Sequence, residues 1–115
     1  MVKPRAPRRG EIIWLNFDPQ TGHEQAGRRP AIVLSDASYN SKSGLALVCP
    51  ITRRAKGYPF EVPLPPRLPL DGVVLVDQLR SLDWRQRKAV FICKLPSDSL
   101  AEITAKAIPL VDPGR

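Results

Sequence analysis

Histidine, cysteine and clustered carboxylates are scarce in this sequence, and each scarcity excludes a kind of site. The 115 residues contain one histidine, His23, and two cysteines. One histidine excludes a nuclease site built on two histidines of the same chain, and no His/Cys group has the spacing of metal ligands. The acidic residues are scattered, without the tight cluster that holds two metal ions. The sequence therefore predicts neither a metal nor a cofactor.

Long apolar runs and disulfide patterns are also missing. Cys49 and Cys93 lie in the short apolar runs 45–51 and 90–95, which is typical of reduced thiols in a core. No run approaches the ~18 residues that span a membrane. The apolar stretch that follows the basic N-terminus is too short for a signal peptide. We expect a cytoplasmic protein with no membrane partner.

Aromatic residues are few, whereas prolines are many. Aromatic residues make up 6% of the chain, and its 13 prolines exceed the usual share of roughly 5% about twofold. Because proline interrupts helices, this composition favours short strands and loops. The length and the 43% of hydrophobic residues fit one domain over residues 1–115.

Basic residues outnumber acidic residues by 18 to 11, which gives a net charge of +7. A basic domain of this size suits a polyanion such as a nucleic acid. A basic composition without any specific partner is the alternative, and charge alone gives the two about equal weight. Residues 1–9 form a basic arm, which we expect to be flexible, although the sequence leaves its order open.

Five segments have the β-branched, apolar composition of short strands. They are residues 10–17, 31–35, 45–51, 73–76 and 87–95. Polar residues, glycines and prolines separate them, which is typical of turns. Many short strands with turn signals between them favour a small barrel or a partly open sheet.

The connections between these strands differ in character. Residues 18–30 form a long polar loop, and 36–44 a polar connection with room for one helical turn. Residues 52–59 form a basic loop. The five prolines of 59–72 allow at most an edge strand followed by an extended loop. Residues 77–84 are predicted to be a turn or a short helical excursion.

The C-terminal segment has a helical period. Ser99 precedes Glu102 by three residues, which is the spacing of a capping box at a helix start. Pro109 ends or kinks this helix. The apolar residues after the box share one helical face: Leu100, Ile103, Ala107 and Ile108.

The densest group of polar residues lies at 22–30. Gly22 and Gly27 let the loop fold tightly against a ligand. Pro30 biases Arg29 toward an extended backbone, which holds its side chain at the mouth of the following strand. On these residues alone, an ordinary salt-bridged loop has about equal weight. Further candidate contacts to a ligand share the loop: His23, Glu24, Gln25 and Arg28.

A second candidate group begins with Thr52, which directly follows a predicted buried strand. Arg53, Lys56 and Tyr58 are in the loop after it. Cations that meet phosphates, beside an aromatic ring that stacks on a base, suit single-stranded nucleic acid. The alternative is a solvated hairpin loop.

A third candidate group is Asp77, Gln78, Arg80 and Ser81. Asp and Gln side chains can read base edges, and Arg80 can hold a phosphate or a guanine. The alternative is ordinary turn and cap chemistry, which Asp and Ser favour.

The order of three segments resembles one known family. PQTGHEQAGRRPAIVLS at 19–35, KGYPFEV at 56–62 and VDQLRSLDW at 76–84 are similar to the MazF/PemK toxins of type II toxin–antitoxin systems. The resemblance runs from about Gly10 to Ala107. The Arg53-Arg54 pair and the proline-rich residues 63–69 depart from the family pattern. Both touch the expected RNA groove, so the cleavage sequence stays open.

The resemblance implies a fold, an activity and partners. Members of the family are mRNA interferases that cleave single-stranded RNA at short sequences. Their mainly β fold is a small SH3-like barrel with a few helices, and they act as homodimers. A cognate MazE-like antitoxin inserts a disordered acidic segment into the RNA groove. By position, Arg29 and Thr52 match the family's catalytic pair, and Glu24 matches its supporting acid.

The chemistry of cutting RNA without a metal is consistent with these residues. The RNA's own 2′-OH attacks the phosphate, which leaves a 2′,3′-cyclic phosphate and a 5′-OH. Arg29 can meet two phosphate oxygens with its planar guanidinium, and Thr52 can add a hydroxyl donor. Glu24 is either the general base or the group that orients Arg29, and the sequence leaves the two open.

Two other functions stay open at this point. The first is a gyrase poison of the CcdB type, which shares the fold class without the ribonuclease site. The second is a non-catalytic RNA-binding or regulatory module, as in a decayed toxin.

Overall fold

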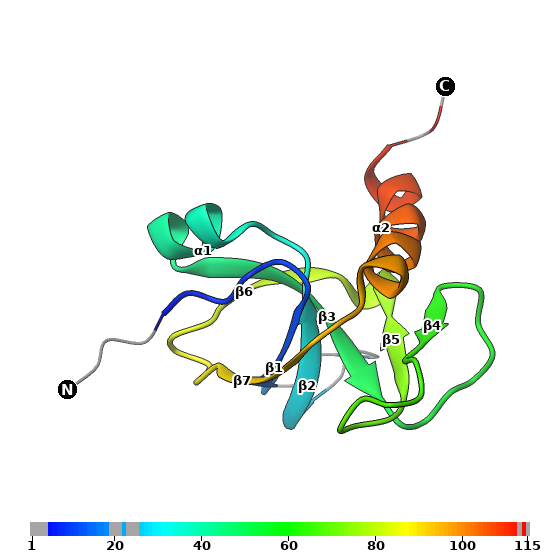
Figure 1. Ribbon diagram of the computed structural model, residues 1–115. Coiled ribbons are helices and arrows are strands. Elements are labelled where there is room, and N and C mark those ends of the chain that lie inside the picture. Colours follow the sequence, from blue (N-terminus) through cyan, green and yellow to red (C-terminus); the bar gives the residue numbers. More distant parts are fainter. Residues whose placement is uncertain (1–4, 19–21, 23–25, 113, 115) are drawn as a thin grey trace.

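The computed structural model describes residues 5–18, 22, 26–112 and 114. These residues form a mainly β structure with two α-helices and one 3-10 helix (Figure 1). The strands are β1 (Glu11–Asn16), β2 (Arg28–Val33), β3 (Leu45–Thr52), β4 (Glu61–Pro63), β5 (Val73–Leu75), β6 (Arg80–Asp83) and β7 (Val90–Lys94). The helices are α1 (Ala37–Ser43), η1 (Val76–Gln78) and α2 (Ser97–Val111).

β3 is at the centre of an antiparallel sheet. The strand order is β4-β5-β3-β2-β1-β7, and β6 pairs with β3 off this path. The start of β3 pairs with β6, and its last two residues pair with β5. Among the described strands no pairing joins β4 to β7, so the sheet is open. The predicted fold class, mainly β with a C-terminal helix, is confirmed, and the open sheet is compatible with a barrel-like fold.

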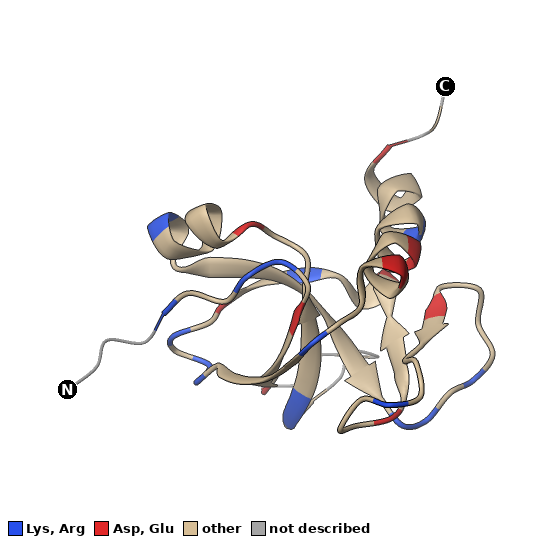
Figure 2. Cartoon of the chain, viewed as in Figure 1, with Lys and Arg blue, Asp and Glu red and all other residues tan. Residues whose placement is uncertain are grey.

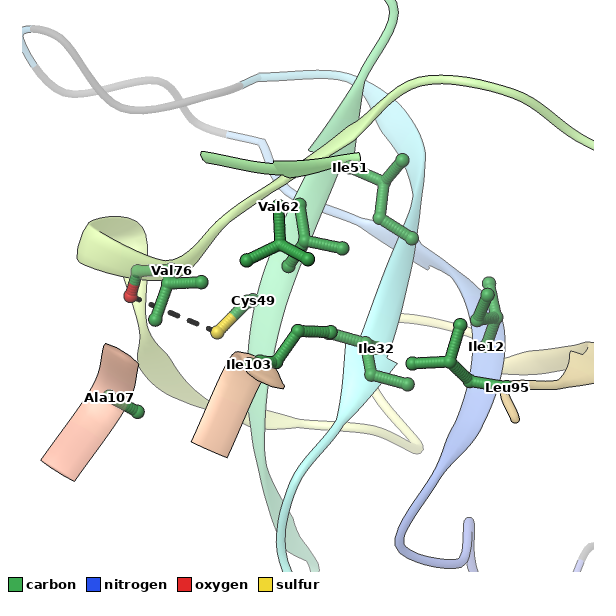
Figure 3. Packing of buried hydrophobic residues seen from close by; sticks show 10 residues of the cluster. Ile12, Ile32, Cys49, Ile51, Val62, Val76, Leu95, Ile103 and Ala107 are labelled. Atoms are coloured by element: carbon green, nitrogen blue, oxygen red, sulfur yellow. Dashed lines mark hydrogen bonds between the residues drawn. The ribbon is translucent and has the colours of Figure 1, made fainter. Parts of the chain in front are cut away.

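One face of the sheet packs against α2. Because side chains alternate along a strand, every second residue of the central strands faces this helix. Ile103 and Ala107 of α2 pack into the resulting cluster (Figure 3). The other fully or almost fully buried members include Ile12, Ile32, Cys49, Ile51, Val62, Val74 and Val76.

The intervening residues of the same strands form a second cluster on the opposite face. It includes Ile13, Leu15, Ala31, Val33, Ala46, Val48 and Trp84. The Trp84 indole Nε1 donates to the Asn40 carbonyl at 2.8 Å, which fixes α1 over this cluster. The buried Asn40 side chain donates in turn to the Pro7 carbonyl at 2.8 Å. The buried polar groups are thus paired, as a rigid core requires.

The two cysteines differ in burial. Cys49 is fully buried, and its thiol is 3.9 Å from the Val76 carbonyl that accepts its hydrogen bond (Figure 3). Burial, with a smaller effect of the Asp77 charge, raises the pKa of the Cys49 thiol to about 12. Cys93 is half-buried, and burial also raises its pKa. The prediction of two core thiols is confirmed for Cys49, whereas Cys93 lies at the margin of the core.

The described part of the N-terminal arm, residues 5–9, is held on the sheet. Both terminal nitrogens of Arg5 donate to the Glu11 carboxylate, at 3.1 and 2.8 Å. This pairing raises the pKa of Arg5. The Arg9 side chain donates to the Leu34 carbonyl at 2.9 Å. The sequence left the order of the arm open, and for these five residues the structure gives contacts to the sheet; residues 1–4 lie outside the described part.

β2 starts at Arg28, inside the stretch predicted as a loop. Arg28 and Arg29 pair with Asn16 and Leu15 of β1. The ladder between the strands extends past Pro30, so the signals of glycine and proline give the wrong boundary here. The consequence is that both arginines start from a regular strand rather than from a loop.

Two other connections have more regular structure than predicted. The segment 36–44 contains the seven-residue helix α1, longer than the one turn expected. Asp36 caps it by accepting from the Ser38 N–H at 3.0 Å, and hydrogen bonds from Ser38 lower the pKa of Asp36. Residues 76–78 are the short helical excursion that was predicted, but 80–83 form strand β6 rather than a turn.

The ends of α2 and β7 also differ from the prediction. α2 begins at Ser97 with Pro96 at the N-cap position, so the capping box at Ser99 is wrong. Pro109 lies inside the helix, which continues to Val111. The prediction that the helix ends at this proline is therefore wrong, although proline removes a backbone donor and Leu110 and Val111 after it are exposed. β7 is Val90–Lys94, shorter than the predicted 87–95.

Candidate active site

A groove of about 1100 Å³ lies where β2 begins and β3 ends. Its walls come from β2, the end of β3, the loop between β3 and β4, and η1. Three groups of residues that are far apart in the sequence therefore meet in one place. The groove brings together these predicted site residues: Arg28, Arg29, Thr52, Arg53, Lys56, Tyr58, Asp77 and Gln78.

Arg29 is positioned by the turn before β2. Its Nε donates to the Ala26 carbonyl at 2.6 Å, which fixes the plane of the guanidinium. Gly27 takes a φ of +77°, and its N–H donates to the Asp18 carboxylate at 2.7 Å. A left-handed backbone of this kind favours glycine. Among the described residues, the terminal nitrogens of Arg29 have no hydrogen-bond partner, and Arg29 lines the groove.

Thr52 is the last residue of β3 and is 6% exposed. Its hydroxyl oxygen accepts from the Arg54 N–H at 3.2 Å, which sets the direction of the side chain. Ala31 of β2 pairs with Pro50 of β3. This ladder ends two residues short of Arg29 on β2 and two residues short of Thr52 on β3. Both residues line the groove beyond the last pair of the ladder.

Gly72 supports Thr52 from behind. A Cβ at this glycine would lie 2.5 Å from the Thr52 carbonyl oxygen, so only a residue without a side chain fits. Its φ of +132° is a second reason for glycine at this position. The backbone of Thr52 is therefore packed directly against the loop before β5.

The basic loop after Thr52 is held by Glu61 of β4. The Glu61 carboxylate accepts from the Lys56 N–H at 3.0 Å and from the Gly57 N–H at 3.0 Å. The Lys56 ammonium lies 5.9 Å from the centre of the Tyr58 ring, which is within cation–π range. Tyr58 itself is 59% exposed. The loop thus presents an aromatic face to the groove from a fixed backbone.

The groove carries a surplus of positive charge. Among the described residues, five cationic and three acidic side chains line it. Of the acids, Glu61 is engaged by backbone N–H groups, and Asp71 pairs with Arg53 at 3.2 Å. That pair is highly exposed, and such pairs contribute little to stability. In Figure 2 the Lys and Arg positions appear at the start of β2 and along the loop between β3 and β4.

Five predicted site residues are not among the described residues that line the groove. Arg80 and Ser81 do not line the groove, because they belong to β6 and pair with Val48 and Leu47 near the start of β3. Their expected RNA contacts would have to be made away from Thr52. The remaining three lie outside the described residues: His23, Glu24 and Gln25.

Three residues of the site were missed by sequence reasoning. Trp14 lines the groove from β1, where its side chain is exposed, but in the sequence it is one more apolar residue of a predicted strand. Glu61 was visible only as one residue of the segment 56–62, without its contacts to the loop. Gly72 gave no local signal, because its role depends on Thr52, 20 positions earlier in the chain.

The described part of the chain has neither a metal-binding cluster nor a membrane-spanning helix. Nowhere among these residues do three His, Cys, Asp or Glu side chains gather in a way that would hold a metal ion. Within the same residues, no helix has both the length and the apolar character to cross a membrane.

Comparison with known proteins shows the family. Residues 8–111 match the model of the PemK-like, MazF-like toxins of type II toxin–antitoxin systems. The chain is 46% identical over 111 residues to the endoribonuclease toxin MazF of Escherichia coli K12, and the match covers 96% of this chain and 99% of that protein. The chain therefore belongs to the PemK/MazF toxin family.

Solved structures of this family are similar to the fold described above. A crystal structure of MazF from Deinococcus radiodurans has a TM-score of 0.91 at 56% identity, covering 94% of this chain and 98% of that chain. A MazE–MazF structure from the same organism has a TM-score of 0.84 at 50% identity, covering 95% of this chain and 98% of that chain.

Proposed function

We propose that the protein is a sequence-specific endoribonuclease toxin that cuts single-stranded RNA in the groove between β2 and β3. The observation that carries this proposal is the meeting of Arg29 and Thr52, from two strands, in one positively charged groove. The endoribonuclease toxin MazF of E. coli K12, at 46% identity, supports the same activity. The substrate is cellular mRNA, so the toxin acts in the cytoplasm.

The RNA supplies its own nucleophile. The 2′-OH attacks the adjacent phosphorus, the bond to the 5′-oxygen breaks, and a 2′,3′-cyclic phosphate and a 5′-OH result. Negative charge gathers on the phosphate oxygens in the transition state. The Arg29 guanidinium, oriented through its Nε, binds two of these oxygens, and the Thr52 hydroxyl donates to the same phosphate. Preorganised donors of this kind contribute about 3–4 kcal/mol each.

Glu24 completes the site in this proposal. Its carboxylate, five residues before Arg29 in the sequence, is proposed either as the base for the 2′-OH or as the group that orients the guanidinium. Arginine is protonated up to pH values above about 12, which makes it a poor base. The candidate contacts to the rest of the RNA are the other groove residues and the loop residues His23 and Gln25.

The proposed partners follow from the charge of the groove and from the relatives. A MazE-like antitoxin places an acidic segment in the same groove and competes with RNA, as polyanions do at a basic surface. The D. radiodurans MazE–MazF structure supports this partner. The active form is a homodimer. Purified MazE of D. radiodurans is a suitable first probe, and inhibition that rises with its concentration is the expected result.

A cleavage assay with two arginine variants tests the activity. The parent cuts single-stranded RNA in the presence of EDTA, and the products end in a cyclic phosphate and a 5′-OH. Arg29→Ala lowers the rate by about 10²–10³-fold, the usual loss for one transition-state donor. Arg85→Ala is the matched control, because Arg85 stacks 4.7 Å from the centre of Trp84 beyond β6, outside the groove. Cleavage that stops with EDTA would disprove the metal-free reaction.

The same assay decides against the two other functions. A gyrase poison leaves RNA intact and binds gyrase. A non-catalytic RNA-binding module binds RNA but gives no cut, with or without Arg29. The relatives described above are endoribonucleases, which favours cleavage over both.

A further inference from the structure

A second, shallower hollow of about 320 Å³ lies beside the groove, in the proline-rich loop between β4 and β5. Three leucines and three prolines of residues 64–70 form most of its lining. Arg53 and Asp71 line it as well, and they form an ion pair. The hollow is thus an apolar floor with a guanidinium at its rim.

The hollow and the groove form one continuous surface. Arg53, Leu70 and Asp71 line both of them. Arg53 follows Thr52 directly in the chain, and Gly72, which follows Asp71, packs against the Thr52 carbonyl. An RNA strand with its cleaved phosphate at Thr52 therefore has a neighbouring nucleotide within reach of this hollow.

Hydrogen bonding, prolines and core packing hold the backbone of the loop that forms the hollow. Leu64 donates its N–H to the Gly72 carbonyl at 2.9 Å, which closes the loop at its base. Three prolines restrict the backbone between these two residues. Arg67 has a φ of +115°, a conformation that costs energy outside glycine and is seen at ligand-binding sites. Leu64, Leu68 and Leu70 pack against the core, so the floor is fixed from below.

We propose that this hollow, formed by residues 64–70, binds one nucleobase of the RNA next to the cleavage position. The inference rests on the proposed endoribonuclease activity. The base lies on the leucine and proline surface, and the phosphates that flank it meet Arg53 and the exposed Arg67. Arg67 makes no hydrogen bond or ion pair with any described residue, so its charge is available. Binding of this kind depends on the flat face of the base and tolerates different bases.

RNA fits this hollow better than the antitoxin peptide does. Arg53 at the rim and the exposed Arg67 in the same loop suit the phosphates on either side of a base, and Arg53, which lines both the hollow and the groove, directly follows Thr52. The one acidic residue of the lining, Asp71, is paired with Arg53. A peptide would use the apolar floor alone, and this alternative is an outcome of the test below.

The test uses short single-stranded RNAs that differ only in which one nucleotide lacks its base. With the parent protein, removing the base that occupies the hollow lowers kcat/KM by about 5- to 150-fold, the range for one stacked base. Pro69→Glu adds a carboxylate at an exposed position of the lining. In this variant, removing the base of that nucleotide lowers kcat/KM by no more than about twofold. Removing the base of any other nucleotide lowers kcat/KM as much as it does with the parent protein.

Ser41→Glu is the matched control. It adds the same charge at an exposed position of α1, outside the groove and the hollow. With this variant, removing any one base lowers kcat/KM as much as it does with the parent protein. Thermal unfolding checks that both variants are folded. The proposal is overturned if Pro69→Glu leaves the effect of every base removal unchanged. It is equally overturned if Pro69→Glu weakens only the binding of D. radiodurans MazE, because the hollow then belongs to a peptide. A parent that cuts none of the RNAs refutes the proposed activity itself.

Discussion

Gly72→Ala is the substitution that best tests how Thr52 is held in place. The added methyl group would lie 2.5 Å from the Thr52 carbonyl oxygen and 3.1 Å from its carbonyl carbon. Both atoms belong to the backbone, so neither can turn away as the end of a side chain would. Relief of the contact requires Thr52 and the loop before β5 to move apart by several tenths of an ångström.

The structure sets the size of the effect. An alanine in a left-handed backbone conformation costs about 1–3 kcal/mol, and overpacking adds about 1–3 kcal/mol. A domain of 115 residues has a free energy of unfolding of about 6–17 kcal/mol at typical values per residue. Gly72→Ala is therefore expected to fold at low temperature with a lowered melting temperature. A shift of about 1 Å in a catalytic group lowers a rate by up to 10²-fold, so we expect cleavage to fall 10- to 100-fold.

Gly44→Ala is the control that separates strain from displacement. Gly44 ends α1 with a φ of +76°, but no atom lies within 4 Å of the place where its Cβ would be. This variant loses stability, by about 1 kcal/mol, through its backbone alone. RNA cleavage is measured at a temperature where circular dichroism shows both variants folded. Cleavage by folded Gly72→Ala at the parent rate would refute the role of Gly72 in positioning Thr52.

Three further predictions concern Glu61 and the two cysteines. Glu61→Ala removes the acceptor that holds the loop after Thr52. We therefore expect KM for RNA to rise about 5- to 20-fold, the effect of one or two lost hydrogen bonds, and the melting temperature to fall only slightly. Glu61→Gln keeps an acceptor and should restore part of the loss in KM. Because the pKa of Cys49 is raised to about 12 in the folded state, its contribution to stability is present below pH 9 and lost as the pH rises toward 12. Urea unfolding at pH 8 and pH 10.5 checks this, and Cys49→Ala should lose less stability than the parent between the two. Iodoacetamide should also modify the half-buried Cys93 before Cys49, and the reverse order would contradict the assigned burial.

The apolar strands were predictable because their pattern is local. Each of the five predicted strand segments overlaps a strand of the structure, because β-branched apolar runs between turn signals are typical of strands. β6 was missed because Arg80 and Ser81 are polar. They form a strand only because the start of β3 offers a free edge for pairing. A single segment carries no information about such a partner.

The site was predictable in part. From the residues alone, a ligand-binding loop and an ordinary salt-bridged loop had equal weight for the segment that contains Arg29. The resemblance to the toxin family singled out Arg29 and Thr52. The groove that joins them depends on the register of β2 and β3. Gly72 and Glu61 act through contacts with residues distant in the sequence or through backbone groups, so no motif shows them. Trp14 looked like one more core residue of its strand.

The central claim is that Arg29 and Thr52 stabilise a phosphate attacked by the RNA's own 2′-OH. One measurement tests it directly: cleavage of an RNA that carries a single 2′-deoxynucleotide on the 5′ side of the cut bond, compared with the all-ribose RNA. The account predicts equal binding, cleavage of the all-ribose RNA to a 2′,3′-cyclic phosphate, and no cut at the deoxy position. A cut at the deoxy position at a comparable rate would contradict it, because a nucleophile other than the 2′-OH would then be at work.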